Sequence, residues 1–340
     1  MLIILVKYFR VFFIIFREVN LLKILKQEAG KITSLEIQGA TNIAHFGVKL
    51  LKDFASRHTD LKPIEMHKEL LKAEEIIGTS RATEPAMYNG LEYIMKNIDQ
   101  EKYNNDPDSK NIALDVSKYY DEYIGILEIS KEKIMEIGAN RVPMREHTIT
   151  IMTHCHSSIT TGILIRAHKQ GKNFKVICTE TRPRFQGRLT AKELIDAGLD
   201  VTMVSDSAMR WCMRNHEISF ILIGADAITS EGTVLNKIGS RLLALASREL
   251  HVPFYVATPL LKFNPKSSFG NLEKIDMRPE EEVWPKSERP EKLKILNPAF
   301  ETISRRYISG LITEAGIFPA SSVSVVFRHT YPFLMNGNMK

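Results

Sequence analysis

The hydrophobic pattern of the chain changes near residue 147, and this change limits the possible folds more than any other feature. Before it, apolar residues recur at helical spacing, as in Ile43, Phe46, Leu50 and Phe54. After it, short β-branched runs alternate with helical stretches. The runs are TITIMTH, FKVICTE, DVTMVSD, SFILIGAD, VPFYVATP and GLITEAG. Such alternation predicts a parallel sheet with helices on both faces.

The sequence therefore predicts an α/β protein of two domains, because 340 residues exceed the length at which one core stops growing. An N-terminal helical domain is expected over residues 19–146, and a parallel-sheet domain over residues 147–340. The polar, proline-rich stretch over residues 262–298 is expected to be a long excursion near the end of the sheet.

Residues 1–18 form an apolar extension that we interpret as not native or dispensable. The run from Met1 to Phe16 is short for a membrane span and contains Lys7 and Arg10. It also lacks the small residues of a signal-peptide cleavage site. An amphipathic surface anchor is the alternative, and no membrane span is expected.

Cysteine usage and charge narrow the class of protein. The chain has three cysteines, Cys155, Cys178 and Cys212, and they form no C-x-x-C motif. Neither a disulfide framework nor a cysteine zinc site is therefore expected, and this cysteine usage fits a cytoplasmic location. Cys178 and Cys212 fall within apolar segments and are expected to be packing residues. The net charge of +6 suits binding to nucleic acid, a membrane surface or a phosphorylated substrate. The sign of the charge alone does not distinguish these three kinds of partner.

Two reactive side chains follow predicted strands, where ligands bind in sheets of this kind. Cys155 precedes Ser157 and a helical pattern, and a helix N-terminus stabilises a thiolate. Asp226 closes the apolar run that begins at Phe220, where partial burial would suit a carboxyl group to proton transfer. A buried packing cysteine and a turn or helix-capping aspartate are the alternatives. His154 and His156 flank Cys155, but without a second cluster they are weak evidence for a metal.

Several positions could bind an anion. A small-residue turn before a helix offers backbone N–H groups, and three later segments offer polar or charged side chains. These candidates are Gly39, Ala40, Thr41, Arg81, Asn236, Lys237 and Lys262. No Walker A motif, dinucleotide fingerprint or nucleophile elbow accompanies them, so no nucleotide cofactor is expected.

Together, five motifs resemble the archaeal ribose-1,5-bisphosphate isomerase family, over about residues 19–327. They are THCHS at Thr153, ETRPRFQGRLTAKEL at Glu180, GADAIT at Gly224, VLNKIG at Val234 and NPAF at Asn297. The family belongs to a group with methylthioribose-1-phosphate isomerase and the alpha, beta and delta regulatory subunits of the guanine-nucleotide exchange factor of translation initiation. The resemblance implies a helical domain followed by a Rossmann-like domain.

The resemblance also implies a reaction, the conversion of ribose 1,5-bisphosphate to ribulose 1,5-bisphosphate without metal or cofactor. Cys155 would accept a proton and Asp226 would donate one, although the residues alone leave these roles open. The Gly39 turn, Arg81, Asn236, Lys237 and Lys262 would hold the sugar bisphosphate. A homo-oligomer is implied, a dimer formed through C-terminal domains or a hexamer as a trimer of dimers, with no nucleic acid or membrane as partner.

One position departs from the family. Its first phosphate turn commonly reads Arg-Gly-Ala, whereas this chain has Gln38 before Gly39 and Ala40. Another cation such as Lys31 or Lys49 would then supply the charge, or the substrate differs. A non-catalytic regulatory subunit and methylthioribose-1-phosphate isomerase are the alternatives. The first has no chemical need for both Cys155 and Asp226, and the second needs an apolar pocket for a thioether.

Overall fold

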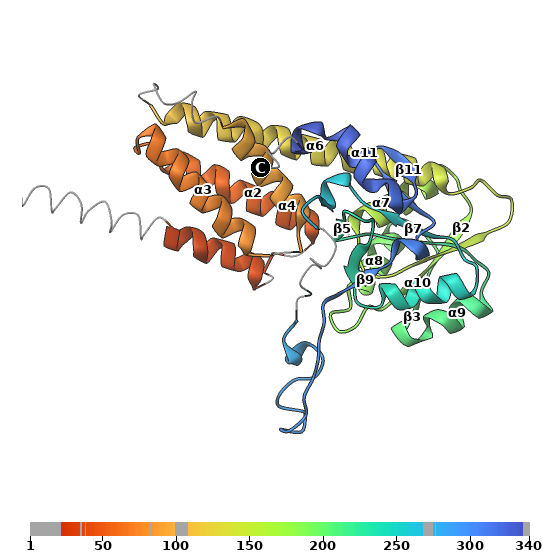
Figure 1. Ribbon diagram of the computed structural model, residues 1–340. Helices are drawn as coiled ribbons and strands as arrows, with labels where there is room; N and C mark the ends of the chain where they lie inside the picture. Colours follow the sequence, from red (N-terminus) through yellow and green to blue (C-terminus); the bar gives the residue numbers. More distant parts are fainter. Residues whose placement is uncertain are drawn as a thin grey trace, which may run out of the picture. The chain divides into compact units, whose positions relative to one another are not determined.

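The computed structural model describes residues 22–34, 36–37, 39–81, 83–98, 108–267, 275 and 277–335 (Figure 1). The predictions for residues 1–18 and for Gln38 lie outside these residues. The chain divides into two compact units, Met1–Gly125 and Ile126–Lys340, each of which is described by itself. No helix in the described ranges combines the length and apolar character needed to cross a membrane.

The first unit is helical throughout its described residues, as the spacing predicts. Its named helices are α2 (Ala40–Arg57), α3 (Pro63–Thr79), α4 (Pro85–Asn97) and the first part of α6 (Lys110–Arg141). Residues 22–33 are also helical. Proline begins both α3 and α4, where its missing N–H costs no helical hydrogen bond. The apolar face of α2 is buried through Ile43, Leu51 and Phe54.

The two units divide inside helix α6, earlier than the boundary at residue 146 that the sequence pattern predicts. The reason is packing, because Ile134 and Ala139 from the last part of α6 belong to the buried cluster of the sheet. The predicted boundary corresponds to the end of the helix at Arg141. The sequence pattern therefore locates the change from helical to strand-containing structure, whereas the boundary between the compact units depends on which residues pack into the core of the sheet.

The second unit contains a seven-stranded sheet in the order β11-β10-β7-β4-β1-β2-β3. All neighbours are parallel except β10 and β11. Its strands are β1 (Ile149–Thr153), β2 (Phe174–Thr179), β3 (Val201–Val204), β4 (Ile218–Ile223), β7 (Phe254–Ala257), β10 (Gly310–Thr313) and β11 (Gly316–Phe318). The six predicted strands and the predicted fold class are confirmed.

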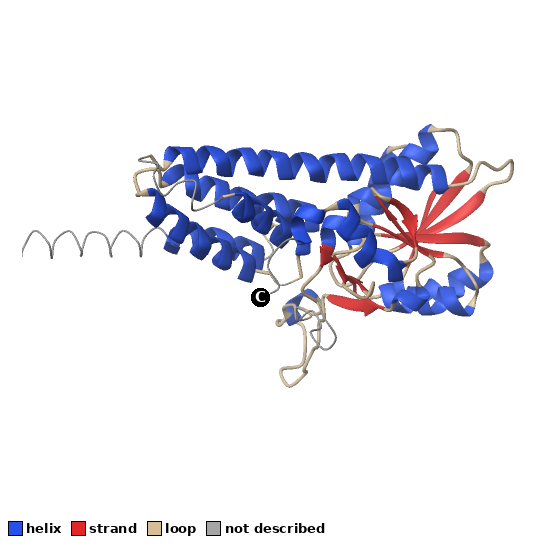
Figure 2. Cartoon of the chain, turned by 45° about the horizontal axis from the view of Figure 1, so that its top comes forward, coloured by secondary structure: helices blue, strands red, loops and turns tan. Residues whose placement is uncertain are grey.

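Helices cover both faces of this sheet (Figure 2). Besides the last part of α6, the helices of this unit are α7 (Ser158–Lys169), α8 (Gln186–Asp196), α9 (Met209–Asn215), α10 (Ser240–Glu249), α11 (Val323–Thr330) and α12 (Pro332–Met335). The described residues of this unit also contain short 3₁₀ turns, η1 (Asp206–Ala208), η2 (Leu260–Lys262), η3 (Glu280–Glu282), η4 (Arg305–Tyr307) and η5 (Ala320–Ser322).

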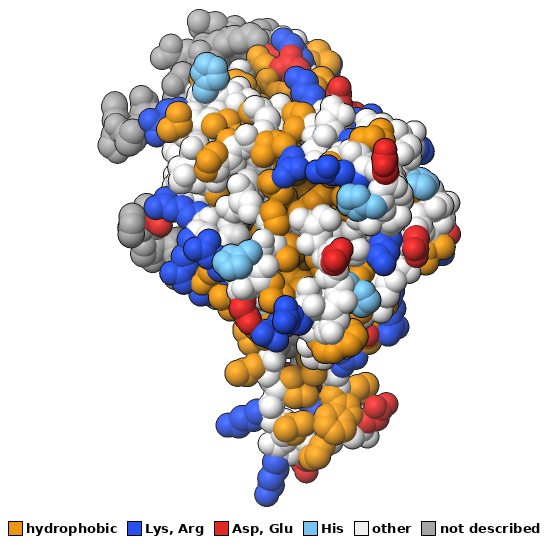
Figure 3. Space-filling model, turned by 90° about the vertical axis from the view of Figure 1, so that its right-hand side faces the viewer, with side chains coloured by type: hydrophobic (Ala, Val, Ile, Leu, Met, Phe, Trp, Pro, Cys, Tyr) orange, Lys and Arg blue, Asp and Glu red, His pale blue; other side chains and the backbone are white. Residues whose placement is uncertain are grey.

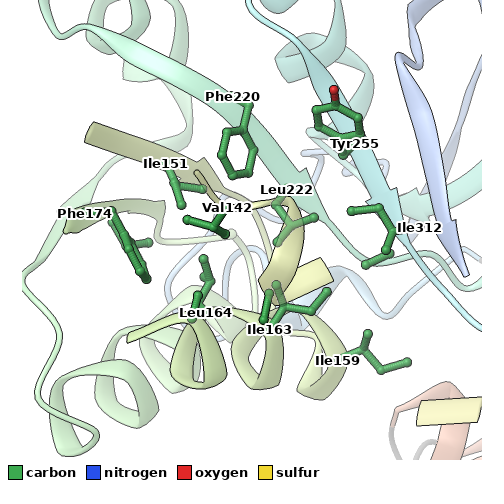
Figure 4. Packing of buried hydrophobic residues seen from close by; sticks show 14 of the residues in the cluster. Val142, Ile151, Ile159, Ile163, Leu164, Phe174, Phe220, Leu222, Tyr255 and Ile312 are labelled. Atoms are coloured by element: carbon green, nitrogen blue, oxygen red, sulfur yellow. The ribbon is translucent and has the colours of Figure 1, made fainter. Parts of the chain in front are cut away.

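One core cluster joins the sheet to α6, α7 and α8 (Figure 4). Ile151 and Leu222 come from the sheet, and Ile163 comes from α7. The next residue along β1, Met152, is also buried, and successive side chains of a strand point to opposite faces. Burying both faces explains why the strands are continuous apolar runs. Cys178 and Cys212 are buried, as expected of packing residues.

A second sheet of four short strands, in the order β8-β5-β6-β9, was not predicted. Its strands are β5 (Ala227–Thr229), β6 (Val234–Lys237), β8 (Phe263–Asn264) and β9 (Phe300–Ile303). Strands of two to four residues carry too little alternation to be recognised in the sequence. Its strands β5 and β6 directly follow β4 in the chain, so they carry the residues that follow Asp226.

Replacing Gly187 by Ala should separate the start of α8 from the end of β2. A Cβ at Gly187 would lie 1.7 Å from the carbonyl oxygen of Thr179, which is backbone and has no rotamer to change. We expect urea unfolding to show a loss of about 3 kcal/mol. The matched change Gly125→Ala in α6 meets no atom within 4 Å and should gain about 1 kcal/mol from helix propensity. Equal effects of the two substitutions would contradict this account of the packing.

Candidate active site

Cys155 lies just beyond β1, in a turn that leads into helix α7. Ser157 caps that helix by accepting a hydrogen bond from the Thr160 N–H at 3.4 Å. Cys155 itself has a φ of 66°, a left-handed conformation that a non-glycine residue keeps only when its surroundings enforce it. Its N–H donates to Thr181 Oγ1 at 3.0 Å, and its carbonyl accepts from Thr190 Oγ1 at 2.9 Å. Two threonines from the β2–α8 segment therefore hold the turn in place.

Asp226 lies just beyond β4, which is the neighbour of β1 in the sheet. The order of strands reverses between β1 and β4, and this reversal opens a crevice at the carboxyl ends of such strands. Asp226 is half-buried, and its N–H donates to the Leu235 carbonyl at 2.9 Å. No described residue donates a hydrogen bond to its carboxylate. The carboxylate is therefore free to face a ligand.

Asn236 and Lys237 end strand β6 and approach the same place. The side chain of Asn236 donates to Ser240 Oγ at 2.9 Å, at the start of α10. Lys237 Nζ lies 4.7 Å from the centroid of the Phe300 ring. Its charge lowers the pKa of Cys155, which places the two side chains within electrostatic range.

Lys262 reaches the site from the far side of β4. It ends the turn η2 after strand β7, the next neighbour of β4, and it is only 9% exposed. Its Nζ donates to the carbonyl of Ala225, the residue before Asp226, at 2.6 Å. The structure thus brings Cys155, Asp226, Lys237 and Lys262 together, although they come from four strand ends.

Neither Lys237 nor Lys262 forms an ion pair with a carboxylate in the part of the chain that the structure describes. Arginines elsewhere in this unit are paired, as in Arg184 with Glu282 and Arg210 with Glu249. A cation taken out of water is costly unless an anion accompanies it. The two lysines therefore indicate a binding place for an anionic ligand next to Cys155 and Asp226.

The local field fixes the protonation of Cys155. The pKa of the thiol is raised to about 11, chiefly by burial and also by the carboxylates of Asp226 and Asp206, whereas Lys237 and the backbone of His156 act to lower it. The ligand-free protein consequently carries a thiol at neutral pH. A helix N-terminus alone predicts a thiolate, and the structure corrects that expectation because desolvation outweighs the helix.

The remaining predicted residues belong to the first unit. Gly39 caps α2 with a φ of 84° and no side-chain hydrogen bond, and Ala40 and Thr41 begin the helix. Arg81 is 9% exposed, and its Nε lies 3.5 Å from Glu84 Oε1. Lys31, proposed as a substitute cation for Gln38, pairs with Glu28 at 2.8 Å. That these first-unit residues take part in binding the substrate stays a prediction.

The sequence did not identify the residues that hold the loop next to Cys155 in place. Asp206 accepts from the N–H groups of Thr181 and Arg182 at 2.8 and 2.7 Å, and so fixes the loop that holds Cys155. Its position just after a strand was the available signal. Among the described residues, no cluster of His, Cys, Asp or Glu could hold a metal ion.

The chain is similar to several known proteins. A family model described as the initiation factor 2 subunit family matches residues 36–320. The ribose 1,5-bisphosphate isomerase of Archaeoglobus fulgidus is 38% identical over 88% of this chain and 91% of its own. The methylthioribose-1-phosphate isomerase of Citrifermentans bemidjiense is 34% identical over 74% of each chain. The crystal structure of translation initiation factor eIF-2B from Pyrococcus horikoshii has a TM-score of 0.70 at 27% identity, covering 89% of this chain and 97% of that one.

The raised pKa of Cys155 predicts slow alkylation at neutral pH. Because the thiolate is the nucleophile, its rate with iodoacetamide should rise about tenfold per pH unit from about pH 7 to about pH 10. Peptide mass spectrometry distinguishes Cys155 from the two buried cysteines. Lys237→Met should lower the rate further, since the lysine lowers the pKa of Cys155. A plateau near pH 8 would show that the thiol is not desolvated.

Proposed function

The chain belongs to the initiation factor 2 subunit family, and from that premise we propose that it is a ribose-1,5-bisphosphate isomerase. The observation that carries the proposal is the pair of lysines beside Cys155 and Asp226, neither of which forms an ion pair with a carboxylate of a described residue. A sugar phosphate supplies the missing anion, and an acid and a base supply the chemistry. A non-catalytic regulatory subunit would have no chemical need for an acid and a base.

The proposed reaction converts α-D-ribose 1,5-bisphosphate to D-ribulose 1,5-bisphosphate. The phosphate on C1 prevents spontaneous ring opening, so the ring must be opened by proton transfer. Cys155 removes the proton from C2, and the electron pair of that bond forms a double bond between C1 and C2. The bond between C1 and the ring oxygen breaks, and Asp226 protonates that oxygen. The resulting enol loses its C2 hydroxyl proton and gains one at C1, which yields the ketose.

The raised pKa of Cys155 defines how this cycle starts. In the free protein the Cys155 thiol is protonated at neutral pH, so it must give up its proton before it can act as a base. Moving that proton from Cys155 to Asp226 creates the base and the acid together, without changing the net charge of the site.

We assign Asn236, Lys237 and Lys262 to a phosphate of the substrate, because Lys237 acts electrostatically on Cys155 and Lys262 contacts the residue before Asp226. In the first unit, the Gly39 turn with Gln38, Ala40 and Thr41, together with Arg81, remains our candidate for binding a phosphate. Backbone N–H groups at the start of α2 suit a phosphate, since no side chain caps that helix.

Assembly and location complete the proposal. We expect a cytoplasmic homo-oligomer, a dimer through C-terminal domains or a hexamer. Large apolar side chains exposed on the second unit support association, with Trp211, Leu242 and Val325 between 61% and 70% exposed. On the face shown in Figure 3, basic side chains are interspersed with acidic and histidine side chains, which supports a small-molecule substrate rather than nucleic acid.

Turnover of two sugar phosphates tests the proposal. Purified protein should convert ribose 1,5-bisphosphate and not methylthioribose 1-phosphate. Cys155→Ser and Asp226→Asn should each lower kcat by about 100-fold or more, the usual loss when a positioned acid or base is removed. Thermal unfolding of both variants should match the wild type, since neither change opens a cavity. Preference for methylthioribose 1-phosphate would favour a methylthioribose-1-phosphate isomerase. No turnover of either sugar phosphate would favour a regulatory subunit.

Lys262→Met should weaken binding more than it slows the reaction. A charge-assisted contact to phosphate is made in both ground and transition states, so we expect KM to rise about 10- to 100-fold. Stability should change little, because an apolar side chain replaces a buried charge of similar length. The control Lys266→Met alters an exposed lysine four positions later and should leave KM unchanged. Equal effects of the two variants would remove Lys262 from the site.

A further inference from the structure

His154 is a buried residue that the proposed mechanism does not use. It is 2% exposed and precedes Cys155. Its Nε2 lies 2.9 Å from the carbonyl oxygen of Ile238, the residue after Lys237. Its Nδ1 lies 2.6 Å from Thr179 Oγ1, at the end of β2. The imidazole therefore bridges the Cys155 turn and the Lys237 segment.

The contacts of His154 define its tautomer. A carbonyl oxygen only accepts hydrogen bonds, so Nε2 carries the hydrogen toward Ile238. In the neutral ring Nδ1 is then an acceptor, and it accepts from the Thr179 hydroxyl. Burial lowers the pKa of His154 and Lys237 lowers it further, against the Ile238 carbonyl and Asp206, so the ring is neutral at neutral pH.

A directed chain of hydrogen bonds runs from this ring back to Cys155. Because Thr179 donates to His154, its oxygen accepts from Thr181 Oγ1 at 3.3 Å. Thr181 Oγ1 in turn accepts from the Cys155 N–H at 3.0 Å. Each hydroxyl donates once and accepts once, so the whole chain has a single direction set by His154.

The space around the ring is filled, which fixes its place. A Cβ at Gly239 would lie 2.8 Å from His154 Cε1 and 2.9 Å from Nε2. Gly239 has a φ of 102°, and its N–H donates to Glu301 Oε1. The segment over residues 237–239 is thus held from β9 on one side and by His154 on the other.

We propose that His154 is a positioning residue that locks the Cys155 turn to the Lys237 segment through this hydrogen-bonded chain. The proposal rests on the roles proposed above for Cys155 and Lys237. The left-handed backbone at Cys155 needs such support, because nothing in its own sequence favours that conformation. His154 thereby sets the distance between the thiol and the cation that would bind phosphate.

Three variants and one control test the proposal. His154→Phe removes both hydrogen bonds, His154→Gln retains a donor toward Ile238, and Thr179→Val removes only the hydroxyl of the chain. His216→Gln alters an exposed histidine on α9's C-terminal side and is the control. We expect kcat to fall about 100-fold for His154→Phe and about tenfold for His154→Gln and Thr179→Val, because small displacements of reacting groups are costly. KM should change less than kcat.

Alkylation of Cys155 gives a readout that does not depend on the substrate. Release of the turn should make the iodoacetamide reaction at Cys155 at least about fivefold faster in His154→Phe and in Thr179→Val, and leave it unchanged in the control. If the protein turns over neither sugar phosphate, the proposed function fails while this measurement still tests His154. Unchanged alkylation in both variants, measured below their unfolding temperatures, would overturn the positioning role. So would a kcat per folded molecule equal to that of the wild type.

Discussion

The parallel pairing of β1 with β2 on one side and with β4 on the other is the constraint on which the site depends. Crossover helices leave β1 and β4 in opposite directions, so the chain segments beyond these two strands separate and leave room for a ligand. Cys155 and Asp226 occupy those two segments. Lys262 follows β7, the next strand, and therefore enters the same crevice from one strand further along.

Position alone does not make the crevice reactive, because the chain must also keep Cys155 in an unfavourable backbone conformation. The hydroxyls of Thr181 and Thr190 and the carboxylate of Asp206 satisfy backbone groups around the turn, and every one of them comes from or next to β2, α8 or β3. Gly187 lets α8 start in contact with the end of β2. Strand β2 and the elements next to it thus supply the framework, while the segments at the ends of β4, β6 and β7 supply the charges.

The larger part of this arrangement could be predicted from the sequence. Five of the six strands are almost fully buried, which leaves little polar alternation in their runs, whereas β3 is exposed or partly buried throughout. Residues just beyond such strands are natural site candidates. The small sheet was missed because its strands are too short to show a period. His154 was weighed only as a metal ligand, since its partners Thr179 and Ile238 are close in space and distant in sequence. The left-handed Cys155 and its desolvation likewise arise from packing that no local pattern records.

The charges of the site place a limit on the mechanism proposed here. Lys237 is the side chain that lowers the pKa of Cys155, and it is also assigned to phosphate. A phosphate bound to Lys237 would cancel much of that effect, because an anion and a cation in contact present little net field to a third group. Substrate binding would then favour the thiol rather than the thiolate. The base must therefore form as its proton moves to Asp226, within the same coupled step that opens the ring, and a long-lived thiolate is not part of the cycle.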